Sequence, residues 1–146
     1  MRAASDRTEY SGSLATEYVG PRLRVIVADG TPRYLETVRS VLDLHDIVDL
    51  VGRAANFEET IQLAVELQPD MVLIDIQMPS AMLAFAAIIT TVRHVYMVGL
   101  FAGRFPPDAA ALILSVNVFV DKARLRDELL PLLPTIHRYR TSLNSF

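Results

Sequence analysis

The fold is decided by the stretch from residue 22 to residue 79, which is RLRVIVADGTPRYLETVRSVLDLHDIVDLVGRAANFEETIQLAVELQPDMVLIDIQMP. Leu23–Ala28 is a short apolar run rich in β-branched residues, which is typical of a buried parallel strand. Thr31 and Pro32 then favour the start of a helix, because threonine caps helices and proline suits their first turn. Further strands are expected at Ile47–Gly52 and Met71–Ile74. This stretch therefore predicts alternating strands and helices.

The alternation continues beyond residue 79. Strands are expected at Val95–Val98 and Val116–Val120, and helices at Ala81–Thr91, at Pro107–Leu114 and from Lys122 onward. Two prolines, Pro131 and Pro134, are expected to kink the last helix or end it early. Repeated strand–helix units predict an α/β sandwich with a central parallel sheet, and right-handed crossovers place helices on both faces of it.

Length and composition limit the possible classes of protein. At roughly 150 residues per domain, a chain of 146 residues predicts one domain, which we place at residues 22–137 between a polar extension (1–21) and a tail (138–146). The 51% hydrophobic content excludes a disordered chain, and the net charge of -3 argues against direct nucleic-acid binding. Membrane insertion is not expected, because no apolar run reaches roughly 18 residues. The absence of cysteine fits a cytoplasmic location.

Two carboxylates and one lysine follow strands that end at the same edge of the expected sheet. Asp29 follows the first strand, Asp75 follows the third and Lys122 follows the fifth. In open parallel sheets, ligands bind beyond the carboxyl ends of the strands. The sequence therefore predicts that these three side chains converge on one functional site.

Two segments, RVIVADGTPRYLETVRSVLD and VDLVGRAANFEETIQLAVELQPDMVLIDIQMP, resemble the receiver domain of bacterial two-component response regulators. The most specific match is DIQMP, and the resemblance covers roughly Leu23 to Leu130. It implies a flavodoxin-like (βα)5 three-layer sandwich whose five-stranded parallel sheet has the order 2-1-3-4-5. It also implies a signalling module that works with a histidine kinase or another signalling protein, and that is not an enzyme beyond its own phosphorylation.

The resemblance implies a role for each residue of the site. Asp75 matches the phosphoacceptor, and Lys122 matches the lysine that pairs with the phosphoryl oxygens. The magnesium ion of such sites is held by acidic residues after the first strand, by the phosphoacceptor and by a carbonyl two residues later. Those positions are Asp29, Asp75 and Gln77. Phe101 matches the aromatic switch residue.

Two positions depart from the family pattern. Gly30 replaces an acidic residue, so we expect weak magnesium binding, because Mg²⁺ needs hard oxygen ligands in near-ideal octahedral geometry. Gly99 replaces the usual threonine or serine, whose hydroxyl contacts the phosphoryl group. We therefore expect a single-domain receiver in which phosphorylation of Asp75 is impaired. The alternative is a fully competent receiver that uses Mg²⁺ with Asp29, Asp75 and Lys122.

Two enzyme classes are weaker alternatives. The tripeptide Asp29-Gly30-Thr31 resembles the DGT of haloacid-dehalogenase-like phosphatases, but Val27 stands where those enzymes need a nucleophilic aspartate. A flavin site of the flavodoxin type would need a phosphate-binding loop of hydroxyl and glycine residues after the first strand. Pro32 removes an N–H from that loop, which argues against such a site.

The C-terminal segment is unusually apolar. We expect Leu132, Leu133 and Ile136 to form the interface of a homodimer or with an output partner, because exposed apolar patches mark such surfaces. The basic-aromatic run from Arg138 to Arg140 that follows is expected to be a solvated terminus.

Overall fold

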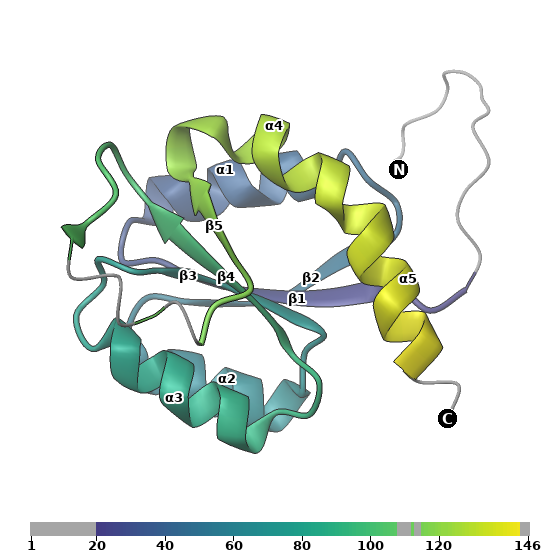
Figure 1. The fold of residues 1–146 in the computed structure, drawn as a ribbon, viewed down its shortest axis with the longest axis horizontal. Coiled ribbons are helices and arrows are strands. Elements are labelled where there is room, and N and C mark those ends of the chain that lie inside the picture. Colours follow the sequence, from purple (N-terminus) through teal and green to yellow (C-terminus); the bar gives the residue numbers. More distant parts are fainter. Residues whose placement is uncertain (1–19, 108–111, 113–114, 144–146) are drawn as a thin grey trace.

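The computed structural model of the chain describes residues 20–107, 112 and 115–143. Within them, strands and helices alternate as Figure 1 shows. The elements in chain order are β1 (Leu23–Ala28), α1 (Pro32–Leu42), β2 (Val48–Ala54), α2 (Phe57–Leu67), β3 (Met71–Asp75), α3 (Ala81–Thr91), β4 (Tyr96–Phe101), β5 (Val118–Asp121), α4 (Leu125–Leu129) and α5 (Leu133–Leu143). Single 3₁₀ turns at Lys122–Arg124 and Leu130–Leu132 flank α4.

The strands form one parallel sheet in the order β2-β1-β3-β4-β5. This confirms the expected fold class and strand order. β2 lies at an edge of the sheet, as the exposed Asp49 on it predicts. β1 and β3 lie at the centre and are buried along almost their whole length.

Helices cover both faces of the sheet, with α1, α4 and α5 on one face and α2 and α3 on the other (Figure 1). Alternate residues of a strand point to opposite faces. Accordingly, Val25 and Val27 of β1 belong to the core under α1 and α5, whereas Ile26 and Ala28 belong to the core over α2 and α3. The two cores fix the sheet, and with it the loops at the carboxyl ends of its strands.

Local signals set the limits of α2. The Asn56 side chain accepts a hydrogen bond from the backbone N–H of Glu59 at 2.9 Å, and the Glu59 carboxylate accepts one from the N–H of Ala55 at 2.8 Å. This is the reciprocal arrangement that the Asn56–Glu59 spacing predicts. The helix ends at Leu67, before Pro69. Val65 of α2 is 47% exposed and does not lie on the buried face of the helix.

The elements after residue 91 differ most from those expected. β4 begins one residue later than predicted and continues to Phe101, through Gly99, because its backbone pairs with β3 from Tyr96 to Leu100 and with β5 up to Phe101. β5 begins at Val118 rather than Val116. Most of the helix predicted at Pro107–Leu114 falls on residues 108–111 and 113–114, which lie outside the described part of the chain. The extension at 1–21 also lies outside it up to residue 19.

The C-terminal segment confirms one expectation and corrects another. The interruption expected at Pro131 is present: α4 ends at Leu129, and Pro131 lies in the 3₁₀ turn that follows. Pro134 lies in the first turn of α5, where proline is tolerated, and that helix continues to Leu143. Leu133 and Ile136 are 0% and 3% exposed, because they pack against the sheet, and Leu132 is only partly exposed. Leu133 and Ile136 are therefore core residues, and they do not form an exposed interface.

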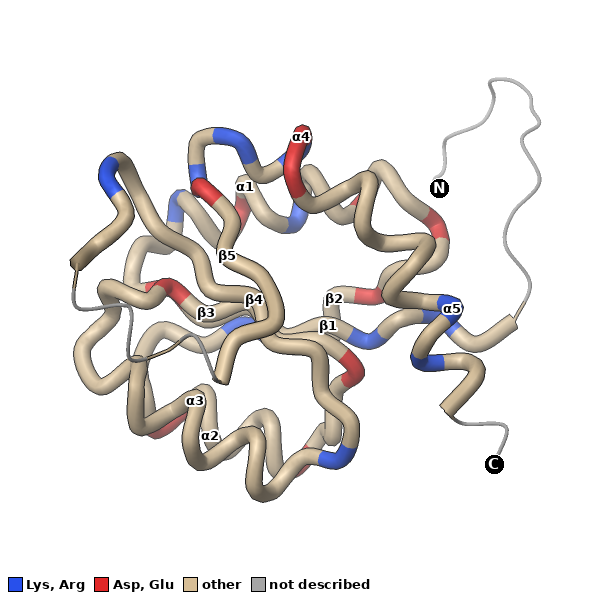
Figure 2. The backbone as a smooth tube through the Cα atoms, in the orientation of Figure 1, with Lys and Arg blue, Asp and Glu red and all other residues tan. Residues whose placement is uncertain are grey.

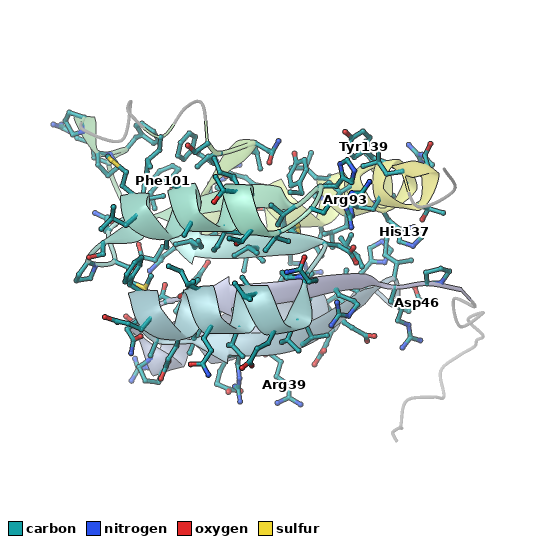
Figure 3. All side chains as sticks on the ribbon, turned by 90° about the horizontal axis from the view of Figure 1, so that it is seen from below. Arg39, Asp46, Arg93, Phe101, His137 and Tyr139 are labelled. Atoms are coloured by element: carbon teal, nitrogen blue, oxygen red, sulfur yellow. The ribbon has the colours of Figure 1, made fainter. Side chains whose placement is uncertain are left out.

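Arg140 is also buried, which corrects the expected solvated terminus at that residue. The Arg140 guanidinium donates hydrogen bonds to the Asp70 carboxylate, with Nη2 at 2.6 Å from Oδ1, and to the backbone carbonyl of His94. This contact ties the end of α5 to the loops that precede β3 and β4. Figure 3 shows the neighbouring Arg93, His137 and Tyr139 grouped at this end of the molecule.

In the described residues, no helix has the length and apolar character needed to cross a bilayer. α3 has no charged residue, and its tube is tan in Figure 2. Three of its apolar side chains are more than 40% exposed, namely Met82, Leu83 and Ile89.

Candidate functional site

Asp29, Asp75 and Lys122 meet at the carboxyl edge of the sheet. Asp29 directly follows β1, Asp75 is the last residue of β3, and Lys122 follows β5. The Lys122 ammonium lies 2.5 Å from Asp29 Oδ2 and 3.1 Å from Asp75 Oδ2, so that it bridges the two carboxylates. The convergence expected from the sequence is therefore present in the structure.

The Asp29 side chain is completely buried. Its Oδ1 accepts a hydrogen bond from the backbone N–H of Thr31 at 2.7 Å, which fixes the turn between β1 and α1. Its Oδ2 is close to the Lys122 ammonium as an ion pair, but off the direction of a hydrogen bond, so that this buried oxygen has no hydrogen-bond partner. A buried carboxylate that lacks a hydrogen bond on one oxygen needs a nearby cation to balance its charge.

Asp75 is oriented by its own loop and remains accessible. Its Oδ1 accepts a hydrogen bond from the backbone N–H of Gln77 at 2.9 Å, and its Oδ2 accepts one from Lys122. The side chain is 13% exposed, whereas that of Asp29 is not exposed at all. Of the two carboxylates, Asp75 is therefore the one that a reagent in solution can reach.

Tyr34 of α1 completes the surroundings of Lys122. The Lys122 ammonium lies 4.8 Å from the centre of the Tyr34 ring, and the Tyr34 hydroxyl donates a hydrogen bond to the Lys122 backbone carbonyl at 3.2 Å. Sequence reasoning missed this residue. The available signal was its position three residues after Thr31, in the first turn of the helix beside the site.

The charge states of these side chains follow from their contacts. Burial alone would lower the pKa of Lys122, but its close contacts with Asp29 and Asp75 and their negative charges outweigh burial and raise the pKa. Burial also raises the pKa of Tyr34, and the charges of Asp29, Asp121 and Asp75 raise it further. At neutral pH the site therefore contains an ammonium ion and an uncharged phenol.

The two glycines that depart from the family pattern lie in contrasting surroundings. A Cβ atom added at Gly30 would meet only the Ala55 carbonyl oxygen, at 3.7 Å, so there is room for a side chain. A Cβ atom added at Gly99 would lie 2.9 Å from Ile76 Cγ2 and 2.9 Å from Phe119 Cδ1. The place of a side chain at residue 99 is therefore already filled.

Phe119 is the second residue that sequence reasoning missed. It is the β5 partner of Gly99 in the strand register, so its ring lies over the glycine. Its ring contacts Phe105 edge to face at 4.9 Å between centroids, and Phe105 contacts Phe101 in the same way at 5.4 Å. Phe101 itself lies at the end of the molecule opposite Arg93 and His137 (Figure 3).

The donor set fits a magnesium ion poorly. The buried Asp29 Oδ2 has no hydrogen-bond partner, as an oxygen that awaits a cation would, but the Lys122 ammonium is already 2.5 Å away. The other oxygens of Asp29 and Asp75 accept backbone N–H groups. No group of three His, Cys, Asp or Glu residues within the described part of the chain could hold a metal. Two carboxylates and the Gln77 carbonyl thus fall short of the hard oxygen shell that Mg²⁺ prefers.

Sequence comparisons find partial relatives. The chain matches no protein-family model. It is 30% identical over 125 residues to protein-glutamate methylesterase/protein-glutamine glutaminase 2 of Photobacterium profundum, which covers 76% of this chain and 30% of that protein. It is 37% identical over 57 residues to the transcriptional regulatory protein LnrK of Bacillus subtilis, which covers 39% of this chain and 26% of that protein. The chain spans less than a third of the length of these curated relatives.

Structural comparisons cover almost the whole of the matching chains. The signal receiver domain of the response regulator NarL from Mycobacterium tuberculosis matches with a TM-score of 0.72 at 23% identity, over 82% of this chain and 98% of that one. The response regulator domain of CheB from Thermotoga maritima matches with a TM-score of 0.70 at 18% identity, over 80% and 97%. These likenesses agree with the strand order and helix placement described above.

Proposed function

Because the chain has the fold of response-regulator receiver domains, we propose that it is a receiver-like signalling module in which phosphorylation of Asp75 is impaired. It takes its input from a histidine kinase or another signalling protein and acts through protein contacts. It is not an enzyme beyond the transfer of a phosphoryl group to its own aspartate.

The observation that carries this proposal is the charge balance of the site. Asp29 and Asp75 are its two carboxylates, Gly30 stands where a third would be, and Lys122 contacts both. Phosphoryl transfer depends on positive charge placed around the transferring group. In this site the Lys122 ammonium is already paired with Asp29, so less positive charge is free to stabilise the transition state.

The chemical step is the transfer of a phosphoryl group to the Asp75 carboxylate. An oxygen of the Asp75 carboxylate attacks the phosphorus of a donor, the bond from phosphorus to the leaving group breaks with its electrons going to that group, and an acyl phosphate forms. The leaving group then takes a proton from solvent. Asp75 is suited to the attack, because its side chain is partly exposed and its Oδ2 lies 3.1 Å from the Lys122 ammonium.

The missing hydroxyl at residue 99 supports impaired signalling as well. In the receiver domains that this chain resembles, that hydroxyl contacts the phosphoryl group and carries the signal toward the neighbouring helix. Here the Phe119 ring fills the space beside Gly99. A phosphoryl group on Asp75 therefore has no hydroxyl at residue 99 to contact, and the packing of Phe119 leaves little room for one.

The experiment is to incubate the protein with Mg²⁺ and a small phosphodonor and to measure the mass addition by intact-protein mass spectrometry. We expect little or no addition to the wild type and a clear gain in Gly30→Asp, because residue 30 has room for the restored carboxylate. Asp75→Asn is the control that must remain unmodified. Rapid, stoichiometric modification of the wild type would overturn the proposal in favour of the fully competent receiver.

The competent receiver is the second candidate because Asp75 and Lys122 keep their hydrogen bond of 3.1 Å. A phosphatase is the alternative from another class, and it is tested by turnover of generic phosphoesters. Robust turnover that is lost in Asp29→Asn would contradict a signalling role. The absence of turnover, together with a modified Gly30→Asp variant, would support it.

A further inference from the structure

Lys122 is the only lysine in the chain; all the other basic residues counted with it are arginines. It is also held in place at both its charged end and its backbone. Its ammonium touches two carboxylates and the face of the Tyr34 ring, and its backbone carbonyl accepts the Tyr34 hydroxyl. Its side chain is only 15% exposed.

We propose that Lys122, positioned by Tyr34, is the built-in counter-ion of this site and takes the place that a divalent cation would otherwise occupy. Tyr34 is a positioning residue, because it contacts Lys122 and neither carboxylate in the described contacts. The inference rests on the proposed function only for the identity of the site, since it concerns the resting state and requires no phosphoryl transfer.

The burial of Asp29 makes a cation at this place necessary. Its side chain is 0% exposed, and Oδ2 has no hydrogen-bond donor. A buried, unpaired carboxylate is strongly destabilising. The Lys122 ammonium at 2.5 Å supplies the compensating charge without any ion from solution. A divalent cation bound to Asp29 and Asp75 would have to displace the ammonium or lie against it, and like charges at that separation repel.

The contacts of Tyr34 explain how a flexible lysine is held in one place. The aromatic face attracts the ammonium, and the attraction is stronger when the pair is shielded from water. The hydroxyl holds the Lys122 carbonyl at 3.2 Å, so the residue is fixed at its backbone and at its charged end. The first turn of α1 is thereby linked to the segment that follows β5.

A single lysine makes this arrangement directly observable. In full-length protein labelled with ¹³C,¹⁵N-lysine, only the Lys122 side chain gives a signal. We expect its Hε protons to be shifted upfield by the Tyr34 ring. Tyr34→Leu should abolish this shift, whereas the matched variant Tyr34→Phe should keep it, because the ring remains. A signal at the free-lysine position, or one that Tyr34→Leu leaves unchanged, would overturn the proposal.

Metal competition supplies the second measurement. We expect millimolar Mg²⁺ to leave the Lys122 signal in place. Mn²⁺ affinity, measured by electron paramagnetic resonance, should rise at least about tenfold in Lys122→Met, because removing the like-charged ammonium removes a repulsion, and a charge at this distance commonly shifts ionic equilibria by that factor or more. In Tyr34→Leu it should rise roughly three- to tenfold, on the scale of one cation–π contact. Displacement of the wild-type signal by submillimolar Mg²⁺ would contradict the inference.

Different outcomes refute the proposed function and the counter-ion inference. If the wild type is readily phosphorylated but shows the shifted Lys122 signal, the proposal of impaired phosphorylation is refuted and the counter-ion inference stands. If the wild type resists phosphorylation but shows a free-lysine signal, the counter-ion inference is refuted and the proposal of impaired phosphorylation stands. If Lys122→Met does not fold, the ring-shift comparison of Tyr34→Leu with Tyr34→Phe decides the inference.

Discussion

The packing around Gly99 predicts that the missing hydroxyl cannot be restored by one substitution. A Cβ atom at residue 99 would lie 2.9 Å from Ile76 Cγ2, 2.9 Å from Phe119 Cδ1 and 3.0 Å from Phe119 Cε1. Carbon atoms in contact normally lie about 3.5–4.0 Å apart. Gly99→Thr therefore forces the Phe119 ring, the Ile76 side chain or the backbone of β4 to move.

The expected effect is a loss of about 1–3 kcal/mol in the free energy of unfolding, which is the usual range for overpacking a well-filled core. Two features of Phe119 place the loss expected for Gly99→Thr inside this range. Phe119 lies on an edge strand and is only partly buried, so that its ring can swing toward solvent. That movement breaks the edge-to-face contact with Phe105, and such contacts contribute about 0.5–1.5 kcal/mol.

The assay is urea unfolding of Gly99→Thr, Phe119→Ala and the double variant, combined as a double-mutant cycle. In the Phe119→Ala background, Gly99→Thr should lose at least half of its effect, and the remainder is due to Ile76. Gly52→Ala is the matched control. It lies on a strand too, but its added Cβ would meet side-chain carbons at 3.3 Å or more, so its effect should be much smaller. A harmless Gly99→Thr, or an equal loss in both backgrounds, would refute the packing argument.

Three further predictions concern other parts of the chain. Arg140→Met should lower the free energy of unfolding by about 2 kcal/mol in urea titrations, because it leaves the Asp70 carboxylate, 15% exposed, without its ion-pair partner; an unchanged midpoint would contradict this. Asn56→Ala should destabilise the protein by about 1 kcal/mol, the usual effect of losing an N-terminal cap, and a change below a few tenths would not fit. The pKa values of Lys122 and Tyr34 are both raised in the folded state, so their contribution is fully present at neutral pH and is lost as pH rises above about 10. Stability of Lys122→Met measured from pH 7 to 11 should therefore fall less steeply than that of the wild type.

The sequence predicts the central part of the fold well, because buried parallel strands are continuous apolar runs. β1 has the expected bounds, and β3 differs only by including Asp75. β4 was predicted too short, since Gly99 interrupts the β-branched pattern although its backbone pairs with β3. Whether a strand continues through a glycine depends on the neighbouring strand, and local propensity does not carry that information.

Some residues of the candidate site could be predicted from the sequence and others could not. Asp29, Asp75 and Lys122 could be predicted to converge because strand topology alone brings their loops together. Tyr34 and Phe119 could not, because their contacts depend on the phase of α1 and on the pairing of β5 with β4.

The expectations that failed are those about exposure near the C-terminus. Arg140 was assigned to solvent because its partner, Asp70, lies 70 residues earlier in the chain. Leu133 and Ile136 were assigned to an interface because a leucine-rich stretch shows how much apolar surface it carries, but not which side meets the sheet. Long-range packing decides both cases, and it also removes the surface on which the expected homodimer interface was based.

The two glycine departures act on different properties of the site, and only one of them is reversible by a single substitution. Gly30 changes charge: it leaves two carboxylates, which one ammonium at 2.5 and 3.1 Å can largely compensate, and the space at residue 30 stays open. Gly99 changes shape, because the Phe119 ring fills the space of the absent side chain. A Gly30→Asp variant should therefore recover cation binding and some phosphorylation of Asp75 without regaining movement of β4 and β5. Phosphoryl uptake and conformational response, measured in the same variant, should separate.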